Sequence, residues 1–291
     1  MAPPQKKLNR MEFLIGFDPK SYPVEMSGGQ TVLRELAKQL SILGQTVYVV
    51  SPQFNVNGTK LISPHEISKL DSDNLITIYP EVTFGNPYNS KHVVRWILYH
   101  TKPEVESTWG TNDVYFYFNN LFVSKENKDK KILNCFDFKL NLFYDKKLNR
   151  EGYCHINRNH VRDSLDSTLK LKYNSEDLFY GHMTIGWEWL VNKLNTKKYF
   201  ITYNVATYYS VIASMCGCVS IILYDGIKED NLKEKVISHK YGIAYGFEEV
   251  EESISNRELL KPYLEEVTKE SIETIKNFIL YWESELKKNI K

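Results

Sequence analysis

The hydrophobic pattern of the chain predicts alternating strands and helices. An apolar run at 13–17 is typical of a buried strand, and apolar residues then recur at three- and four-residue spacing, as one helix face requires. This face consists of Val32, Leu33, Leu36, Leu40 and Leu43. Gly44 ends the expected helix in a left-handed cap, and the β-branched segment 46–51 predicts the next strand. A strand–helix–strand unit of this length indicates a parallel sheet with helices on its faces.

Weaker signals continue this pattern through the first half of the chain. We expect strands at 75–79 and 113–119, and a helix over the segment NSKHVVRWILYH at 89–100. One face of this expected helix is mostly apolar, so Arg95 and Trp96 are predicted to pack in the core, with Arg95 in an ion pair.

A change of composition near residue 124 predicts two domains. The charged run SKENKDKK at 124–131 is typical of a solvated loop, and we interpret it as a linker between a domain at 11–124 and another at 125–265. The second domain repeats the alternation, with strands expected at 132–138, 153–157, 198–202 and 219–224 and helices at 186–194 and 206–217. A broad apolar face within 266–288 predicts a long final helix. The fold class is therefore α/β.

Composition excludes several classes of protein. Lys and Arg number 37 against 36 Asp and Glu, so no global positive field would attract nucleic acid or an anionic membrane. The four cysteines, which include Cys216 and Cys218 around a helix-ending glycine, form neither a disulfide framework nor zinc spacing. No signal-type segment follows the N-terminus, and no stretch approaches 18 apolar residues. We expect a reduced, cytoplasmic location without a transmembrane segment; composition does not indicate the oligomeric state.

The turn Ser27-Gly28-Gly29 stands between the first strand and the first helix. A helix start carries unpaired N–H groups and a partial positive charge, so glycines there let the backbone approach a phosphate. A plain turn explains the two glycines equally well. The glycine patterns of dinucleotide folds and P-loops are absent, which argues against a nicotinamide-dependent oxidoreductase.

The second domain has a comparable strand end. Tyr203, Asn204 and Thr207 lie where an expected strand ends and a helix begins, the edge at which open α/β sheets bind ligands. A role for Thr207 as N-cap is compatible with phosphate contact. Tyr245, in the segment YGIAY, is expected either to line a nucleotide pocket or to form part of a surface turn. Two such edges, one in each domain, predict a ligand cleft.

Several segments, in order, resemble the GT-B glycosyltransferases, especially the compact bacterial and viral enzymes related to glycogen-synthase-like and rhamnosyl transferases. The segments that carry the resemblance cover most of the chain from residue 12 and read GGQTVLRELAKQLSILGQTVYVVSP, GNPYNSKHVVRWILYH, REGYCHINRNH, KYFITYNVATYYSVIASMCGCVSIIL and KYGIAYGFEEVEES.

The resemblance implies two Rossmann-like lobes with parallel sheets facing a central cleft, and a helix at 266–291 that crosses back to the N-terminal lobe. It implies transfer of a hexosyl or deoxyhexosyl group from a UDP-, GDP- or dTDP-sugar to a hydroxyl of a glycan, without metal or other cofactor. By the same resemblance the diphosphate meets Gly28 and Gly29, Arg158, and the helix start at Thr207. If the gene is viral, the cytoplasm is that of the host.

Two departures from the family pattern leave alternatives open. The acidic pair at seven-residue spacing found in many retaining relatives is not evident around 225–245, so the stereochemistry stays undecided. Asn159 and Asn204 stand where the family has a basic and an acidic residue. A degenerate protein that binds nucleotide or glycan without turnover, and a nucleotide-sugar epimerase, are therefore alternatives.

An inverting transfer requires a base for the acceptor hydroxyl. Asp18, directly after the first strand, is the first candidate, and His100 is the second. A turn-capping carboxylate and a structural histidine are the corresponding roles without catalysis.

Overall fold

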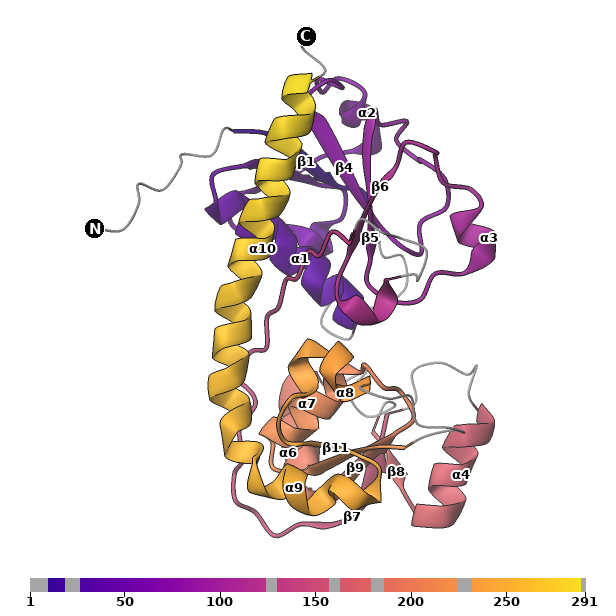
Figure 1. Ribbon diagram of the computed structural model, residues 1–291, viewed down its shortest axis with the longest axis vertical. Helices are drawn as coiled ribbons and strands as arrows, with labels where there is room; N and C mark the ends of the chain where they lie inside the picture. Colours follow the sequence, from indigo (N-terminus) through magenta and orange to yellow (C-terminus); the bar gives the residue numbers. More distant parts are fainter. Residues whose placement is uncertain are drawn as a thin grey trace, which may run out of the picture. The chain divides into compact units, whose positions relative to one another are not determined.

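The computed structural model describes residues 10–18, 27–123, 130–156, 163–178, 186–223 and 232–288. They belong to two compact units (Figure 1): unit 1 comprises Met1–Asp137 and Thr268–Lys291, and unit 2 comprises Phe138–Val267. Each unit is built around a sheet of parallel strands, which confirms the α/β class. Among the described residues, no helix combines the length and the apolar character that crossing a membrane requires.

Unit 1 contains a six-stranded sheet in the order β3-β2-β1-β4-β5-β6, with every neighbouring pair parallel. The strands are β1 (Glu12–Ile15), β2 (Thr46–Val49), β3 (Thr59–Leu61), β4 (Leu75–Pro80), β5 (His92–Ile97) and β6 (Val114–Tyr117). This is the strand order of the doubly wound dinucleotide-binding fold, in which the chain reverses direction across the sheet between β1 and β4.

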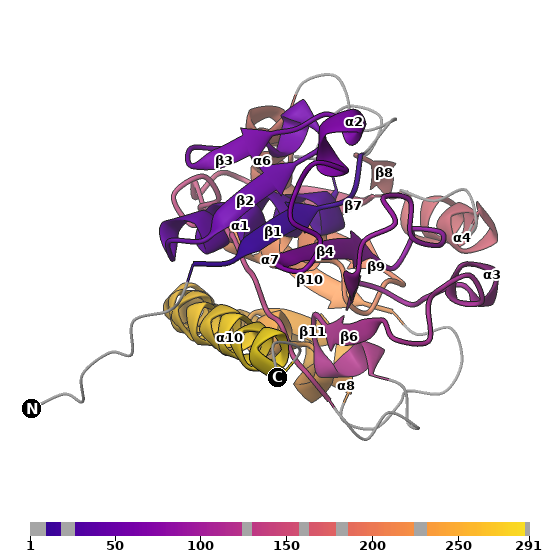
Figure 2. The ribbon, with the colours of Figure 1, turned by 90° about the horizontal axis from the view of Figure 1, so that it is seen from above.

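Helices α1 and α10 pack on one face of this sheet (Figure 2). The helices of unit 1 are α1 (Gly28–Ile42), α2 (Pro64–Ile67), α3 (Pro103–Glu106) and the later turns of α10 (Leu260–Lys288). Leu36 of α1 and Phe278 of α10 share one core with Phe13 of β1, and the rings of Phe13 and Phe278 lie 5.6 Å apart. The C-terminal helix thus completes a core that begins at the start of the chain.

The helix predicted at 89–100 is wrong, because this segment forms β5 between β4 and β6. A strand buried on both faces is apolar almost continuously, and such a run has no period that separates it from a buried helix. The prediction for Arg95 is correct: the side chain is fully buried and its Nε lies 2.7 Å from Asp113 Oδ2. Trp96 is also buried, and its indole N–H donates to the carbonyl of Leu133.

Unit 2 contains a five-stranded parallel sheet in the order β11-β10-β9-β7-β8. The strands are β7 (Glu151–His155), β8 (Glu176–Asp177), β9 (Lys197–Thr202), β10 (Val219–Ile222) and β11 (Ile243–Tyr245). Counted along the chain, this is the flavodoxin-like order 2-1-3-4-5, which reverses between β7 and β9. The strand expected at 132–138 is reduced to one bridge between Tyr117 and Ile132.

The helices of unit 2 connect these parallel strands. They are α4 (Asp163–Tyr173), α6 (Trp187–Thr196), α7 (Tyr208–Met215), α8 (Leu232–Lys235), α9 (Val250–Ser255) and the first turns of α10. Gly217 follows α7 with a φ of +86° and has the left-handed conformation expected of a helix-ending glycine.

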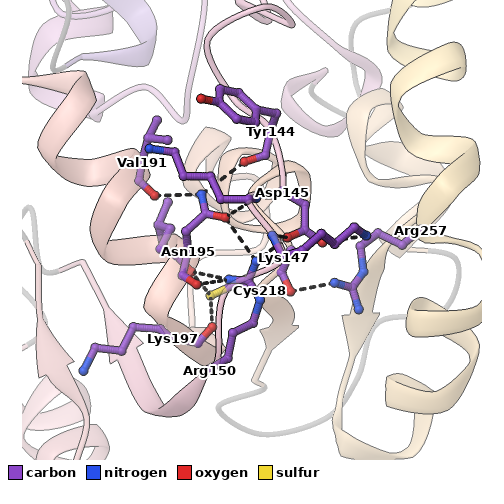
Figure 3. Close-up of polar contacts among 12 residues, drawn as sticks. Tyr144, Asp145, Lys147, Arg150, Val191, Asn195, Lys197, Cys218 and Arg257 are labelled. Atoms are coloured by element: carbon purple, nitrogen blue, oxygen red, sulfur yellow. Dashed lines mark hydrogen bonds and ion pairs between the residues drawn. The ribbon is translucent and has the colours of Figure 1, made fainter.

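Side chains below the amino ends of the unit 2 strands form a polar network (Figure 3). Arg150 pairs with Asp145 and donates to the Asn195 carbonyl. The buried Asn195 side chain accepts from the Lys146 amide, and Arg257 donates to the Gly217 carbonyl at 2.6 Å. These groups satisfy one another, so the network is structural and leaves the opposite edge of the sheet as the candidate for ligand binding.

Candidate functional site

Sheet topology defines one candidate site in each unit. In open parallel sheets, ligands bind beyond the carboxyl ends of the strands where the strand order reverses. We call these positions the unit 1 edge, after β1 and β4, and the unit 2 edge, after β7 and β9. The unit 1 edge comprises Asp18, Ser27, Gly28, Gly29, Glu81, Leu98 and His100. The unit 2 edge comprises Tyr203, Asn204, Thr207, His239 and Tyr245.

The glycine turn of the unit 1 edge forms the start of α1. Ser27 is the N-cap, and its hydroxyl accepts from the Gln30 amide at 3.4 Å. A Cβ on Gly28 would meet no atom of the described residues within 4 Å, and one on Gly29 would lie 3.5 Å from Leu98 Cδ1. Neither glycine has a positive φ, so backbone conformation does not require glycine here. The two residues leave the helix start bare, as close approach of an anion requires.

Asp18 and His100 both lie at the unit 1 edge. Asp18 is exposed; burial raises the pKa of Tyr88, and the nearby Asp18 carboxylate adds to that shift. His100 is exposed and packs edge-on against Phe122, with ring centres 5.2 Å apart. Among the described residues, Asp18 and His100 share no hydrogen bond or ion pair.

Glu81 is a residue of this edge that sequence reasoning missed. It follows β4 directly, retains 8% of its surface exposure, and its Oε2 accepts from the Leu98 amide at 3.1 Å. Within the described part of the chain no cationic side chain pairs with it. Desolvation raises the pKa of Glu81 to about 7. The sequence contains the signal that could have identified Glu81, because a carboxylate directly after an expected strand is also the reason for choosing Asp18.

The pKa of Glu81 predicts a pH-dependent stability. An unfolded glutamate ionises near pH 4.3, so between about pH 4.3 and 7 folded Glu81 keeps a proton that the unfolded chain has lost. The contribution of Glu81 to stability is therefore highest below this window and falls by about 3 kcal/mol as pH rises through it. Glu81→Gln removes the effect, so its advantage over the wild type in urea unfolding should grow by this amount from pH 4 to 8.

The matched control is Glu35→Gln. Glu35 is equally buried in unit 1 but carries an ion pair, with Lys38 Nζ at 3.0 Å. Parallel pH curves for the wild type and Glu81→Gln would contradict the prediction.

Short side chains fix the loop of the unit 2 edge between β9 and α7. The Asn204 amide donates to Thr202 Oγ1 at 3.0 Å, and Asn204 Oδ1 accepts from the Ala206 amide at 3.1 Å. Thr207 is the N-cap of α7, and its hydroxyl accepts from the Tyr209 amide at 3.3 Å. This arrangement holds the helix start in a defined shape.

Two buried residues, His239 and Tyr245, support the loop between β9 and α7. The Tyr245 hydroxyl donates to the Val205 carbonyl at 3.1 Å and lies 2.8 Å from His239 Nδ1. Burial lowers the pKa of His239 to about 3, against a smaller opposite effect of the Thr207 backbone, so the ring is neutral. The ring is fully buried, and a hydrogen bond with the Thr207 backbone at the start of α7 opposes the effect of burial on its pKa. A neutral, buried imidazole thus supports the loop that begins this helix.

The other residues predicted for the donor site are either packed in the core of unit 2 or lie outside the described residues. Tyr203 is half-buried and packs against the apolar core of unit 2, while Tyr245 is fully buried. Arg158 and Asn159 lie outside the described residues. His239, which the sequence analysis did not single out, shows no pattern in the sequence that separates it from other histidines.

The two parallel sheets, with polar residues at the unit 1 edge and the unit 2 edge, define a protein with two Rossmann-like α/β units. No family model matches the chain, and no curated protein matches it in sequence. Among solved structures, the crystal structure of TarM is similar with a TM-score of 0.38 and 11% identity, covering 76% of this chain and 56% of that chain. This chain thus spans little more than half of the TarM chain.

Proposed function

We propose that this protein is a GT-B-type glycosyltransferase, which moves a hexosyl or deoxyhexosyl group from a nucleoside-diphosphate sugar to a glycan hydroxyl. The observation that carries the proposal is the pair of doubly wound sheets in one chain, each with a ligand edge at its topological switch point. Such a transfer needs one site for the nucleotide and one for the acceptor. The resemblance of the sequence segments to this enzyme class supports the same function.

In this proposal the unit 2 edge binds the donor diphosphate. The backbone N–H groups at the start of α7, together with Arg158, stabilise the charge that develops when the sugar–phosphate bond breaks. In unit 1, the glycine turn at Gly28 and Gly29 offers backbone N–H groups to an anion, and Asp18 and His100 are the candidate bases that the sequence offers for the acceptor hydroxyl. Backbone and guanidinium groups supply this stabilisation without a metal ion.

The test is a paired substitution at Thr207 that keeps the helix cap and changes only charge. Asp and Asn are both good N-caps, so neither variant should unfold α7. If a diphosphate binds the start of α7, Thr207→Asp should weaken binding of UDP, GDP or dTDP at least tenfold, and Thr207→Asn should preserve it. Titration calorimetry without divalent metal measures this directly.

A ligand present at a hundred times its dissociation constant should also stabilise the wild type by about 2.7 kcal/mol, which a thermal-shift assay detects. If no nucleoside diphosphate binds the wild type at millimolar concentration, the proposal is wrong.

One observation favours the alternative of a binding protein without turnover. Asn204 stands where the family has an acidic residue, and its Oδ1 is occupied by the Ala206 amide within the turn. Release of nucleoside diphosphate from a nucleotide sugar by the purified protein decides between the two functions. Binding without release would support the alternative.

A further inference from the structure

The most unusual ionisable group at the unit 1 edge is the carboxyl of Glu81. Its position follows from topology, because it is the first residue after β4, and the strand order reverses between β4 and β1. The register aligns Ile15 of β1 with Ile78 of β4, so the chain leaving β1 towards Asp18 passes beside the end of β4. Glu81 therefore lies at the place where this kind of sheet binds its ligand.

Backbone hydrogen bonds orient this carboxyl. Oε2 accepts from the Leu98 amide, and the Leu98 side chain lies next to Gly29 at the start of α1. The amide of Glu81 itself also donates to the carboxyl. Among the described residues no cationic side chain pairs with Glu81, so the protein holds the carboxyl at the edge without an ion pair.

Charged neighbours do not fix the protonation state of Glu81. Asp18 follows β1, His100 follows β5, and the first turn of α1 carries no acidic residue. Arg95 on β5 is paired with Asp113. Desolvation is the largest cause of the raised pKa of Glu81, about 7, and no charged side chain contributes to it. A carboxyl in this state exchanges protons near neutral pH.

From this geometry we infer that Glu81 is the catalytic base of the unit 1 edge, in place of Asp18 or His100. The inference rests on the proposed glycosyl transfer. The acceptor hydroxyl, or a water molecule, gives its proton to the Glu81 carboxylate while its oxygen bonds to the anomeric carbon. The bond from that carbon to the diphosphate oxygen breaks, and its electron pair leaves with the nucleoside diphosphate. Direct displacement of this kind inverts the anomeric centre.

Because water can replace the acceptor, the test requires no knowledge of the natural glycan. Nucleoside diphosphate release is measured between pH 5 and 9 with UDP-glucose, UDP-N-acetylglucosamine, GDP-mannose and dTDP-rhamnose. In the wild type, kcat/KM should rise about tenfold per pH unit up to about pH 7 and then level off. Glu81→Gln keeps an oxygen for the Leu98 amide but cannot take a proton. It should lower the rate about 100-fold or more and remove this pH dependence.

Two matched variants separate the catalytic role from a structural one. Glu35→Gln, which changes an equally buried carboxyl of unit 1, should leave rate and pH profile unchanged. Asp18→Asn should retain the rise towards pH 7. If Glu81→Gln keeps the wild-type profile, or if Asp18→Asn abolishes it, the inference is overturned.

Failure of the inference differs from failure of the proposed function. Nucleotide binding to the wild type without turnover at any pH overturns the role of Glu81 and leaves the nucleotide site of unit 2 intact. Absence of nucleotide binding overturns the proposed transferase itself. Release of a sugar with retained configuration, seen by proton NMR before mutarotation, also overturns direct displacement at Glu81.

Discussion

Replacing Phe278 with alanine is expected to destabilise unit 1 by about 3–5 kcal/mol. Phe278 is on α10, is 1% exposed, and contacts Phe13 of β1 and Phe116 of β6, the latter with ring centres 4.8 Å apart. The substitution removes a ring from the middle of the core and leaves a cavity that rigid strands cannot fill. Hydrogen exchange of the amides in β1 and β4 measures the effect on unit 1 separately from unit 2.

The control for this experiment is Phe247→Ala. Phe247 belongs to unit 2 and is 43% exposed, so its removal should leave exchange in β1 and β4 unchanged. A loss below about 1 kcal/mol for Phe278→Ala would mean that α10 does not complete the core of unit 1.

Replacing Asp113 with alanine is expected to lower the free energy of unfolding by about 3–5 kcal/mol, because it leaves the buried Arg95 guanidinium without its counter-ion. Arg95 is fully buried, and its guanidinium carbon lies over the rings of Tyr79 and Trp109, at 5.1 and 5.0 Å from their centres. It also donates to the Gly85 carbonyl. Urea unfolding at neutral pH measures the loss.

Two comparisons make this prediction specific. The double variant Arg95→Met with Asp113→Ala removes the stranded charge and should recover part of the lost stability. Asp73→Ala breaks the exposed pair between Asp73 and Lys91 and should cost less than about 1 kcal/mol. Equal losses in the single and double variants would contradict an electrostatic origin.

Local sequence patterns predict the fold where one face of an element is polar. The helix from Gly28 to Ile42 and its end at Gly44 follow from apolar spacing and a glycine cap, and the structure confirms both. The same reasoning fails at β5, where Val94 and Trp96 face one side of the sheet and Arg95 faces the other, all buried. Periodicity carries no information when both faces are covered, and the identity of the covering elements is a tertiary property.

At the candidate site, some residues could be predicted from local sequence and others depend on tertiary packing. The positions of Asp18, Asn204 and Thr207 were predictable because each follows a strand or begins a helix, and the topology places them at the carboxyl ends of the sheets. Glu81 and His239 acquire their properties from burial by residues distant in sequence. Leu98 orients Glu81 from the end of β5, and Val205 binds the tyrosine that contacts His239. A pKa shift caused by desolvation has no counterpart in a local sequence pattern.

The shared helix α10 has a consequence for biosynthesis. Unit 1 needs Phe278 and its neighbours, yet the ribosome makes them only after all of unit 2. At about 5–20 residues per second, the first strands wait about 13–50 seconds for the helix that covers them. During that interval Phe13 and Phe116 lack the Phe278 ring, and this part of the core is available to chaperones. The domain that is translated first is therefore the last to complete its core, and unit 2 finishes folding beside an incomplete neighbour.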